Sequence, residues 1–323
     1  MAGHWVTPFV RGDGGQLTRK ESSKPWYESS NRPSEFHNKE KMPTNRRGTQ
    51  QLHHGDDNMS DVTAHIDRQL SVAFVVAPGA ELIDIAGPWG VFEYTTSATT
   101  GQSPFALSLV AESSDPLPLS GGIQVVPNQT LSSYQNPDIV VIPAIGVEFS
   151  DGLLDWLRSS HSKAQVTMSV CNGAFALAAA GLLDGRTATC HHGSYRLMQA
   201  LYPSLAVERG VRWIDHGDVA TAGGLTSGTD LALHIVERLF GSDTAELAAS
   251  QLEYFGVGWR DPAVNATFAN DPSPPPGLVL DPICGMAVNP AEAISARWQG
   301  VDRAFCSDWC RDRFLASPER FTA

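Results

Sequence analysis

The stretch QVTMSVCNGAFALAAAGLLDGRTATCHH, residues 165–192, decides the fold. It opens with a short apolar run that ends at Val170, Cys171 follows at once, and Gly173 leads into an alanine-rich segment. This order predicts a buried strand that turns sharply into a helix, as in the elbow that holds a hydrolase serine. Cys171 therefore lies at the carboxyl end of a strand, where ligands bind in open α/β sheets.

Apolar runs on both sides of this stretch predict further strands of the same sheet. They lie at 71–77, 105–112 and 138–144, and a further strand is expected in 218–224. Helical patterns lie at 151–161, 173–183 and 226–240, and residues 83–94 are expected to form a turn that leads into a short helix. A small hairpin with Gly121-Gly122 at its turn is expected at 117–131. Strands that alternate with helices predict an α/β fold with a parallel sheet covered on both faces.

Composition excludes several classes of protein. The 323 residues include 23 Lys and Arg against 35 Asp and Glu, a net charge of −12, which argues against binding of nucleic acid through its phosphates. No apolar run approaches the roughly 20 residues that span a bilayer, and the first thirty residues show no signal-peptide pattern. We expect a cytoplasmic protein with neither nucleic-acid nor membrane partners.

The chain divides into four segments. Residues 1–66 lack a hydrophobic period and predict a disordered tail, and the sequence leaves open whether translation starts at Met1 or at Met59. Residues 67–257 carry the α/β pattern, and a proline-rich linker is expected at 258–277. Residues 278–323 hold three of the five cysteines.

The start of a helix favours the thiolate of Cys171, because the unpaired amides there carry partial positive charge. The same amides could stabilise an anion that develops on a substrate. An inert buried cysteine is the alternative, although it leaves Gly173 unexplained. Cys190, at the end of a short apolar run, is expected to be buried.

The segments DIAGPWGVFE, GGIQVVPNQTL, VCNGAFALAAAGLLDGRTAT and TAGGLTSGTDLALHIVE resemble the DJ-1/PfpI superfamily, the class I glutamine-amidotransferase-like proteins. Within it they are most similar to isonitrile hydratases and to the sensor domains of AraC-type regulators. The resemblance covers about residues 70–255. It implies a flavodoxin-like parallel sheet sandwiched by helices, and a homodimer.

The resemblance also implies roles for individual residues. Cys171 would be the nucleophile, Asp84 the acid that protonates or orients the reacting group, and His191 a further site residue. Asn172 and Gly146 would form the oxyanion or substrate-binding part. A cap or turn residue is the alternative for Asp84, and a structural histidine the alternative for His191.

Three positions depart from the family pattern. Asn172 stands where isonitrile hydratases have Thr, and His192 replaces a Trp. The usual Pro-Gly-Gly after the third strand reads Pro-Ala-Ile-Gly at 143–146. The resemblance still implies an enzyme that acts on a small molecule without a cofactor in this domain, by addition of the thiolate to an isonitrile and hydrolysis to a formamide. A non-catalytic protein that senses a ligand, a redox change or a metal is the alternative.

The C-terminal segments DPICGM, FCSDWCRDRF and SPERF resemble the YHS domain. Its cysteines here are Cys284, Cys306 and Cys310, and the resemblance implies that they bind a soft metal. Zinc would need a fourth ligand, such as Asp281 or water, whereas three thiolates suit Cu(I). A fold that binds no metal remains the alternative.

Overall fold

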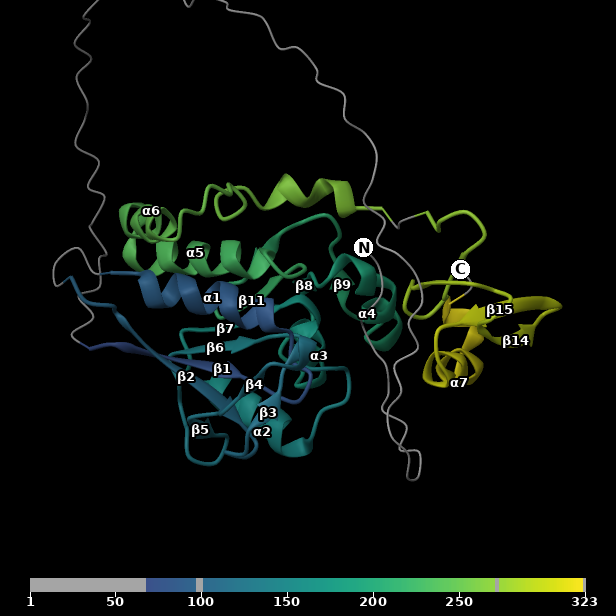
Figure 1. Cartoon of the computed structure of the whole chain (residues 1–323), viewed down its shortest axis with the longest axis horizontal. Helices are drawn as coiled ribbons and strands as arrows, with labels where there is room; N and C mark the ends of the chain where they lie inside the picture. Colours follow the sequence, from purple (N-terminus) through teal and green to yellow (C-terminus); the bar gives the residue numbers. More distant parts are fainter. Residues whose placement is uncertain (1–67, 97–100, 271–272, 322–323) are drawn as a thin grey trace, which may run out of the picture. The chain divides into compact units, whose positions relative to one another are not determined.

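The computed structural model describes residues 68–96, 101–270 and 273–321 (Figure 1). The predicted tail at 1–66, including Met59, lies outside the described residues.

A seven-stranded sheet in the order β10-β11-β7-β6-β1-β2-β5 forms the centre of the fold. Its strands are β1 Leu70–Val75, β2 Phe105–Ala111, β5 Gln129–Thr130, β6 Ile139–Ile142, β7 Val166–Val170, β10 Trp213–Asp215 and β11 Val219–Ala222. All neighbouring pairs are parallel except β10 and β11. The order β2-β1-β6-β7-β11 is the flavodoxin-like one, so the predicted fold class is confirmed. The antiparallel edge strand β10 was not predicted.

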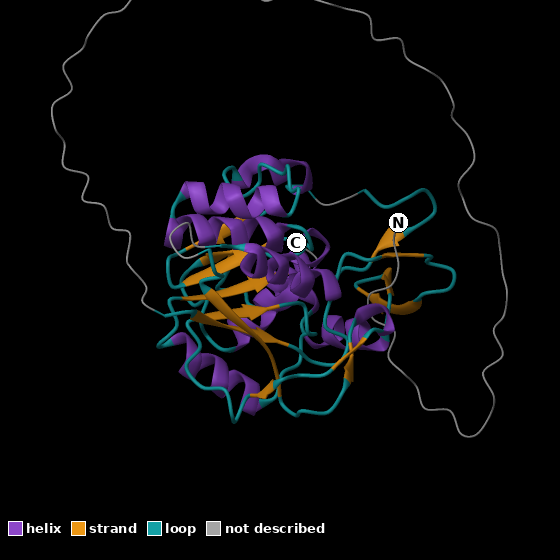
Figure 2. Ribbon diagram, turned by 60° about the vertical axis from the view of Figure 1, so that its left-hand side comes forward, coloured by secondary structure: helices purple, strands orange, loops and turns teal. Residues whose placement is uncertain are grey.

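Both faces of the sheet are buried, which explains why its strands read as continuous apolar runs. In β1, Val72 and Phe74 pack into one core while Ala73 and Val75 pack into the other. The first core is covered by α1 Leu82–Tyr94, α5 Ser227–Phe240 and α6 Ser242–Gln251; the second by α2 Asp151–His161, α3 Ala174–Ala179 and α4 Tyr195–Leu201. Figures 1 and 2 show the helices on the two sides of the strands.

Two helices of the first layer approach each other closely. A Cβ on Gly87 of α1 would lie 2.5 Å from Thr229 Oγ1, and a Cβ on Gly228 of α5 would lie 2.7 Å from a methyl of Val170. Only glycine leaves room for these contacts. They pack α1 against α5, and the start of α5 against the carboxyl end of β7.

Short elements complete this part of the chain. The predicted hairpin is confirmed as β3 Leu117–Pro118 and β4 Gln124–Val125, with Gly121 at φ +74° in the turn between them. β8 Thr187–Ala188 pairs with β9 Ala206–Val207. The helix expected at 173–183 is shorter, because α3 ends at Ala179 and Gly181 takes φ +77°.

The first residues of the predicted linker pack as part of the fold. Trp259 is 4% exposed in the first core, and Pro262–Phe268 form a 3-10 helix. The packed region therefore extends beyond residue 257.

The C-terminal residues form two hairpins, one α-helix and a 3-10 helix at Pro318–Phe321. The hairpins are β12 Val279–Leu280 with β13 Ala287–Val288, and β14 Ile294–Trp298 with β15 Val301–Phe305. The helix α7 Asp308–Ala316 begins after Ser307, whose side chain accepts a hydrogen bond from the Cys310 N–H. Phe305 and Phe314 pack against each other, with ring centroids 5.3 Å apart, and both belong to the second core.

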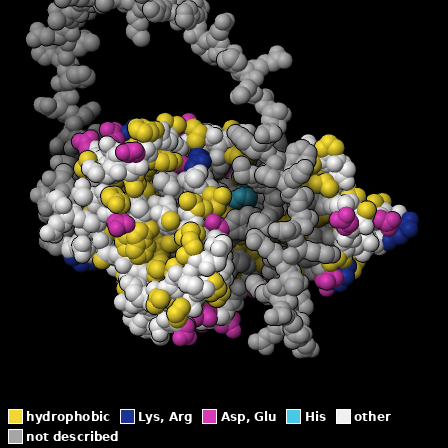
Figure 3. All heavy atoms as spheres, viewed as in Figure 1, with side chains coloured by type: hydrophobic (Ala, Val, Ile, Leu, Met, Phe, Trp, Pro, Cys, Tyr) yellow, Lys and Arg dark blue, Asp and Glu magenta, His cyan; other side chains and the backbone are white. Residues whose placement is uncertain are grey.

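Acidic side chains are scattered over the face seen in Figure 3, among apolar and neutral ones. In residues 68–96, 101–270 and 273–321, none of the helices combines the length and apolarity needed to cross a bilayer.

Candidate active site

The strand β7 ends at a strained corner. Cys171 follows Val170 directly and takes φ +58°, a left-handed conformation that non-glycine residues rarely adopt. A Cβ on Gly173 would lie 2.0 Å from the carbonyl oxygen of Ile142, so only glycine lets the chain pass this close to β6. The predicted elbow is therefore present. Strain of this kind persists only where the surrounding structure enforces it, and it is concentrated at functional sites.

Asp84 reaches the same corner from the first turn of α1. Its carboxyl is fully buried, and Oδ2 accepts a hydrogen bond of 3.0 Å from the Ala144 N–H at the end of β6. Burial raises the pKa of Asp84 to about 7, while the hydrogen bond from the Ala144 N–H and the neighbouring Cys171 thiol lower it. The structure thus brings the Asp84 carboxyl and Cys171 together at this corner. Asp84 lies within α1, however, and not in a turn before it.

The Cys171 sulfur lies among backbone donors, yet its thiol form is favoured. The N–H groups of Asn172 and Leu225 lower the pKa of Cys171, but burial raises it well above the ordinary value and the Asp84 carboxyl adds to the rise. The expected preference for the thiolate is thus not met, because the side chain is only 3% exposed and desolvation outweighs the amides. The sequence did not predict that the Leu225 N–H would act on the Cys171 sulfur. The Gly-Gly pair after β11, which indicates a tight turn there, was the available signal.

His191 lies over the turn that follows β11. A Cβ on Gly224 would meet the His191 ring at 2.5 Å, and His191 Nδ1 accepts a hydrogen bond of 3.1 Å from the Gly193 N–H. Burial lowers the pKa of His191 to about 4, and His192 adds to this shift. The ring is therefore neutral at pH 7 with its proton on Nε2. The His192 ring lies between those of His191 and Phe268, 4.3 and 4.4 Å from them.

The two residues predicted for the oxyanion part differ in position. Asn172 is next to Cys171, and its Oδ1 is buried without a hydrogen-bond partner among the described residues. Gly146 lies on an exposed turn with φ +104°, two residues beyond the Ala144 N–H that contacts Asp84. Within the described part of the chain, the contacts of the corner include Ala144 and not Gly146.

Cys190 is fully buried, as predicted. Its thiol donates to the His191 carbonyl at 3.6 Å and adds to the rise in the pKa of Cys171, and burial raises the pKa of its own thiol.

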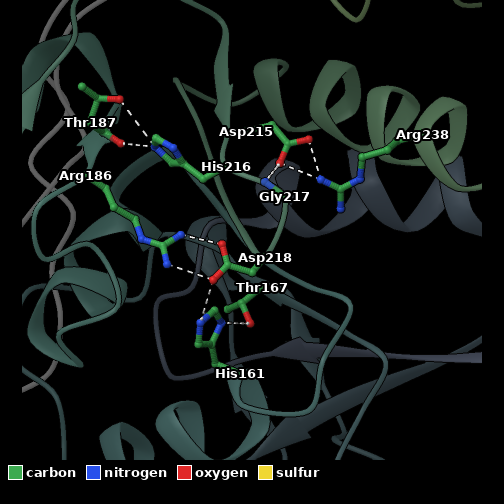
Figure 4. A network of polar contacts seen from close by, with 9 residues as sticks. All are labelled: His161, Thr167, Arg186, Thr187, Asp215, His216, Gly217, Asp218 and Arg238. Carbon is green, nitrogen blue, oxygen red and sulfur yellow. Dashed lines mark hydrogen bonds and ion pairs between the residues drawn. The ribbon is translucent and has the colours of Figure 1, made fainter.

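A second polar network lies at the opposite end of the sheet (Figure 4). Arg186 and His161 contact Asp218, which precedes β11, and Arg238 contacts Asp215 at the end of β10. The Asp218 carbonyl accepts from the Thr167 N–H near the amino end of β7. These groups join strand ends to helices and lie away from Cys171.

The three C-terminal cysteines form a cluster with a buried carboxylate. Cys306 Sγ lies 3.6 Å from both Cys284 Sγ and Cys310 Sγ. One ligand atom from each cysteine and from Asp281 all lie within 4.8 Å of one another. Asp281 is 0% exposed and accepts from the N–H groups of Cys306 and Ile283, both at 2.8 Å. The predicted ligand set is therefore brought together.

Comparisons with known proteins show which proteins this chain is similar to. The model of the DJ-1/PfpI family matches residues 70–238. An isonitrile hydratase from Pseudomonas putida is 33% identical over 206 residues, which cover 61% of this chain and 86% of the relative. The HTH-type transcriptional regulator CdhR from Pseudomonas aeruginosa is 31% identical over 147 residues, 44% of this chain and 42% of the regulator.

A solved structure shows the same fold. The crystal structure of a ThiJ/PfpI family protein from Pseudomonas syringae has a TM-score of 0.50 and 25% sequence identity, and the match covers 63% of this chain and 83% of that one.

Proposed function

Because the chain belongs to the DJ-1/PfpI family, we propose that it is a cysteine-dependent enzyme that hydrates a small molecule of the isonitrile class. The pairing of Cys171 with Asp84 carries this proposal. Burial raises the pKa of Asp84 to about 7, and a group that titrates near neutral pH can accept and deliver a proton in one reaction. The similarity to an isonitrile hydratase supports the substrate class.

In the first step the Cys171 sulfur bonds to the isonitrile carbon. Burial disfavours a free thiolate, so the Asp84 carboxylate takes the thiol proton as the sulfur attacks. Asp84 then delivers that proton to the same carbon, which gives a thioimidate. The N–H groups of Asn172 and Leu225 stabilise the charge on sulfur during the attack.

In the second step water adds to the thioimidate carbon. The carbon–sulfur bond breaks, a proton returns to Cys171, and an N-substituted formamide leaves. One isonitrile and one water thus give one formamide. His191, neutral with its proton on Nε2, contributes a hydrogen-bond donor in this reaction.

The test is hydration of an alkyl isonitrile, with the formamide measured by NMR. We expect Cys171→Ala to fold and to lose turnover. The turnover rate of Asp84→Asn should fall at least about 100-fold, the lower end of the range for removal of an acid–base group. Asp155→Asn, which removes an exposed carboxyl on α2, is the matched control for Asp84→Asn and should keep full turnover. Full activity of Cys171→Ala would show that the proposal is wrong.

Sensing is the second candidate function, and the match to a transcriptional regulator favours it. In that case isonitriles, amides and dicarbonyls would not turn over. Peroxide would oxidise the Cys171 thiol to a sulfenic acid with release of water, detectable by dimedone labelling. Turnover of any of these substrates by the wild type but not by Cys171→Ala would decide for the enzyme.

We also propose that residues 278–323 form a YHS-like module that binds a soft metal. In a tetrahedral zinc site with Zn–S bonds of about 2.3 Å, sulfurs lie about 3.8 Å apart. The two Sγ–Sγ distances of 3.6 Å fit such a site, and they also fit trigonal Cu(I). Cys284, Cys306 and Cys310 would hold either metal, with Asp281 as a fourth ligand for zinc.

Metal analysis of the purified full chain tests this proposal. After loading with Zn²⁺ or with Cu(I) we expect one equivalent of metal, and Cys306→Ser should abolish it. Cys190→Ser should retain it. Unchanged metal content in Cys306→Ser would exclude these cysteines as ligands. The homodimer implied by the resemblance stays a prediction, which analytical ultracentrifugation would check.

A further inference from the structure

The turn after β11 contacts Cys171 in two places. The Gly223 carbonyl accepts a hydrogen bond of 2.9 Å from the Cys171 N–H, and the Leu225 N–H lowers the pKa of the Cys171 thiol. Leu225 takes φ +50°, so this turn is strained as well. The position of the turn therefore sets the surroundings of the sulfur.

Arg212 holds the same turn in two places. Its carbonyl accepts a hydrogen bond of 2.8 Å from the Gly223 N–H, and its guanidinium donates to Thr226 Oγ1 at 3.2 Å. The guanidinium also pairs with Asp230, whose side chain is 1% exposed. Arg212 thus spans the turn from its first residue to its last.

Arg212 and Asp230 are in turn held by the segment 254–262. The Tyr254 hydroxyl donates to Asp230 Oδ1 at 2.8 Å, and the Pro262 carbonyl accepts from the Arg212 N–H at 2.7 Å. A Cβ on Gly258 would lie 2.5 Å from Asp230 Oδ2, so the segment also packs tightly on this pair. The segment lies beyond residue 238, where the match to the family model ends.

We propose that Arg212 is a positioning residue that fixes the turn 223–226, and through it the Cys171 sulfur, and that the segment 254–262 is required for this. The chain of contacts is continuous. It runs from Tyr254 through Asp230 and Arg212 to the turn, and from the turn to Cys171. The proposal holds whether Cys171 catalyses or senses.

The test measures the sulfur itself and needs no substrate. Iodoacetamide labelling of Cys171 in the full chain is followed from pH 6 to 11 by mass spectrometry, in Arg212→Lys and Tyr254→Phe. Lysine keeps the charge beside Asp230 but lacks the fork that also reaches Thr226. Arg238→Lys and Tyr202→Phe are the matched controls, because their partners, Asp215 and the Phe175 carbonyl, lie outside this chain of contacts.

We expect the midpoint of labelling to rise by about half a unit to one unit in Arg212→Lys, which slows labelling at pH 8 by about threefold to tenfold. The rise follows because the sulfur loses the Leu225 N–H while it stays buried. Tyr254→Phe should show a smaller rise in the midpoint of labelling. If Arg212→Lys does not fold, the midpoint of Tyr254→Phe by itself tests the proposal. Unchanged midpoints would overturn the proposal. So would a fall toward the ~8.5 of a free thiol, which indicates a loosened structure and not a displaced turn.

Discussion

Replacement of Asp84 by Asn tests the electrostatics of the buried corner through the stability of the whole protein. The carboxyl is fully buried, and Asn keeps an oxygen that can accept from the Ala144 N–H. Burial raises the pKa of Asp84 from 3.8 to about 7 in the folded state. Between these two values the folded protein binds a proton that the unfolded chain has released. The stability of the wild type therefore falls as the pH rises through this window.

The size of the effect follows from the shift. At about 1.4 kcal/mol per pKa unit, a shift of about three units is worth about 4 kcal/mol in total. About 3 kcal/mol of this is lost between pH 5 and pH 8, because the window closes just above pH 7. Asn has no proton to lose. The stability of Asp84→Asn relative to the wild type should rise by that amount over this pH range.

Urea denaturation at pH 5 and at pH 8 measures the difference. Asp155→Asn, which removes an exposed carboxyl on α2, is the matched control and should change by no more than about 0.5 kcal/mol between the two pH values. An Asp84→Asn difference that is the same at both pH values would refute the reasoning. The carboxyl would then be ionised in the folded protein well below pH 7.

Two further predictions concern stability. Gly173→Ala should lower the free energy of unfolding by about 3 kcal/mol or more, because the new Cβ would lie 2.0 Å from the Ile142 carbonyl oxygen. Gly152→Ala is the control and should change the urea midpoint little, because the nearest atom to its new Cβ would be 3.8 Å away. Asp138 accepts hydrogen bonds from Arg68, which lower its pKa to about 2, so its contribution is present above pH 4 and is lost as the pH falls toward 2. The free energy of unfolding of Asp138→Asn should depend less on pH in that range than that of the wild type. An unchanged pH dependence would contradict this.

The order of strands and helices could be predicted from the sequence because each buried strand is a short apolar run bounded by turn residues. The strand that ends at Val170 and the turn at Gly173 are examples, since strand, corner and helix are local in the chain. The edge strand β10 was missed, because three residues at the end of a sheet carry too little pattern. The length of α3 was missed because Gly181 ends it within an otherwise apolar run.

For the candidate site, the identity of the residues could be predicted but their protonation could not. Cys171 and Asp84 could be named from local sequence and from the family resemblance, and the C-terminal cysteines from their spacing. Their protonation could not be predicted. The start of a helix favours the thiolate, yet the pKa of Cys171 is raised, because desolvation depends on how many layers of other side chains cover the sulfur.

The α/β fold class and the elbow at Cys171 could be predicted from periodicity and glycine placement, and the family resemblance implied that Asp84 meets the thiol there. The three-dimensional packing was needed to show that Ala144 and Leu225 supply the N–H groups and that Arg212 holds the turn behind them. Such backbone contacts join strands far apart in the chain, and they depend on atoms that every residue shares. The pattern of side chains along the sequence therefore does not predict these contacts, which depend on how the strands and turns pack.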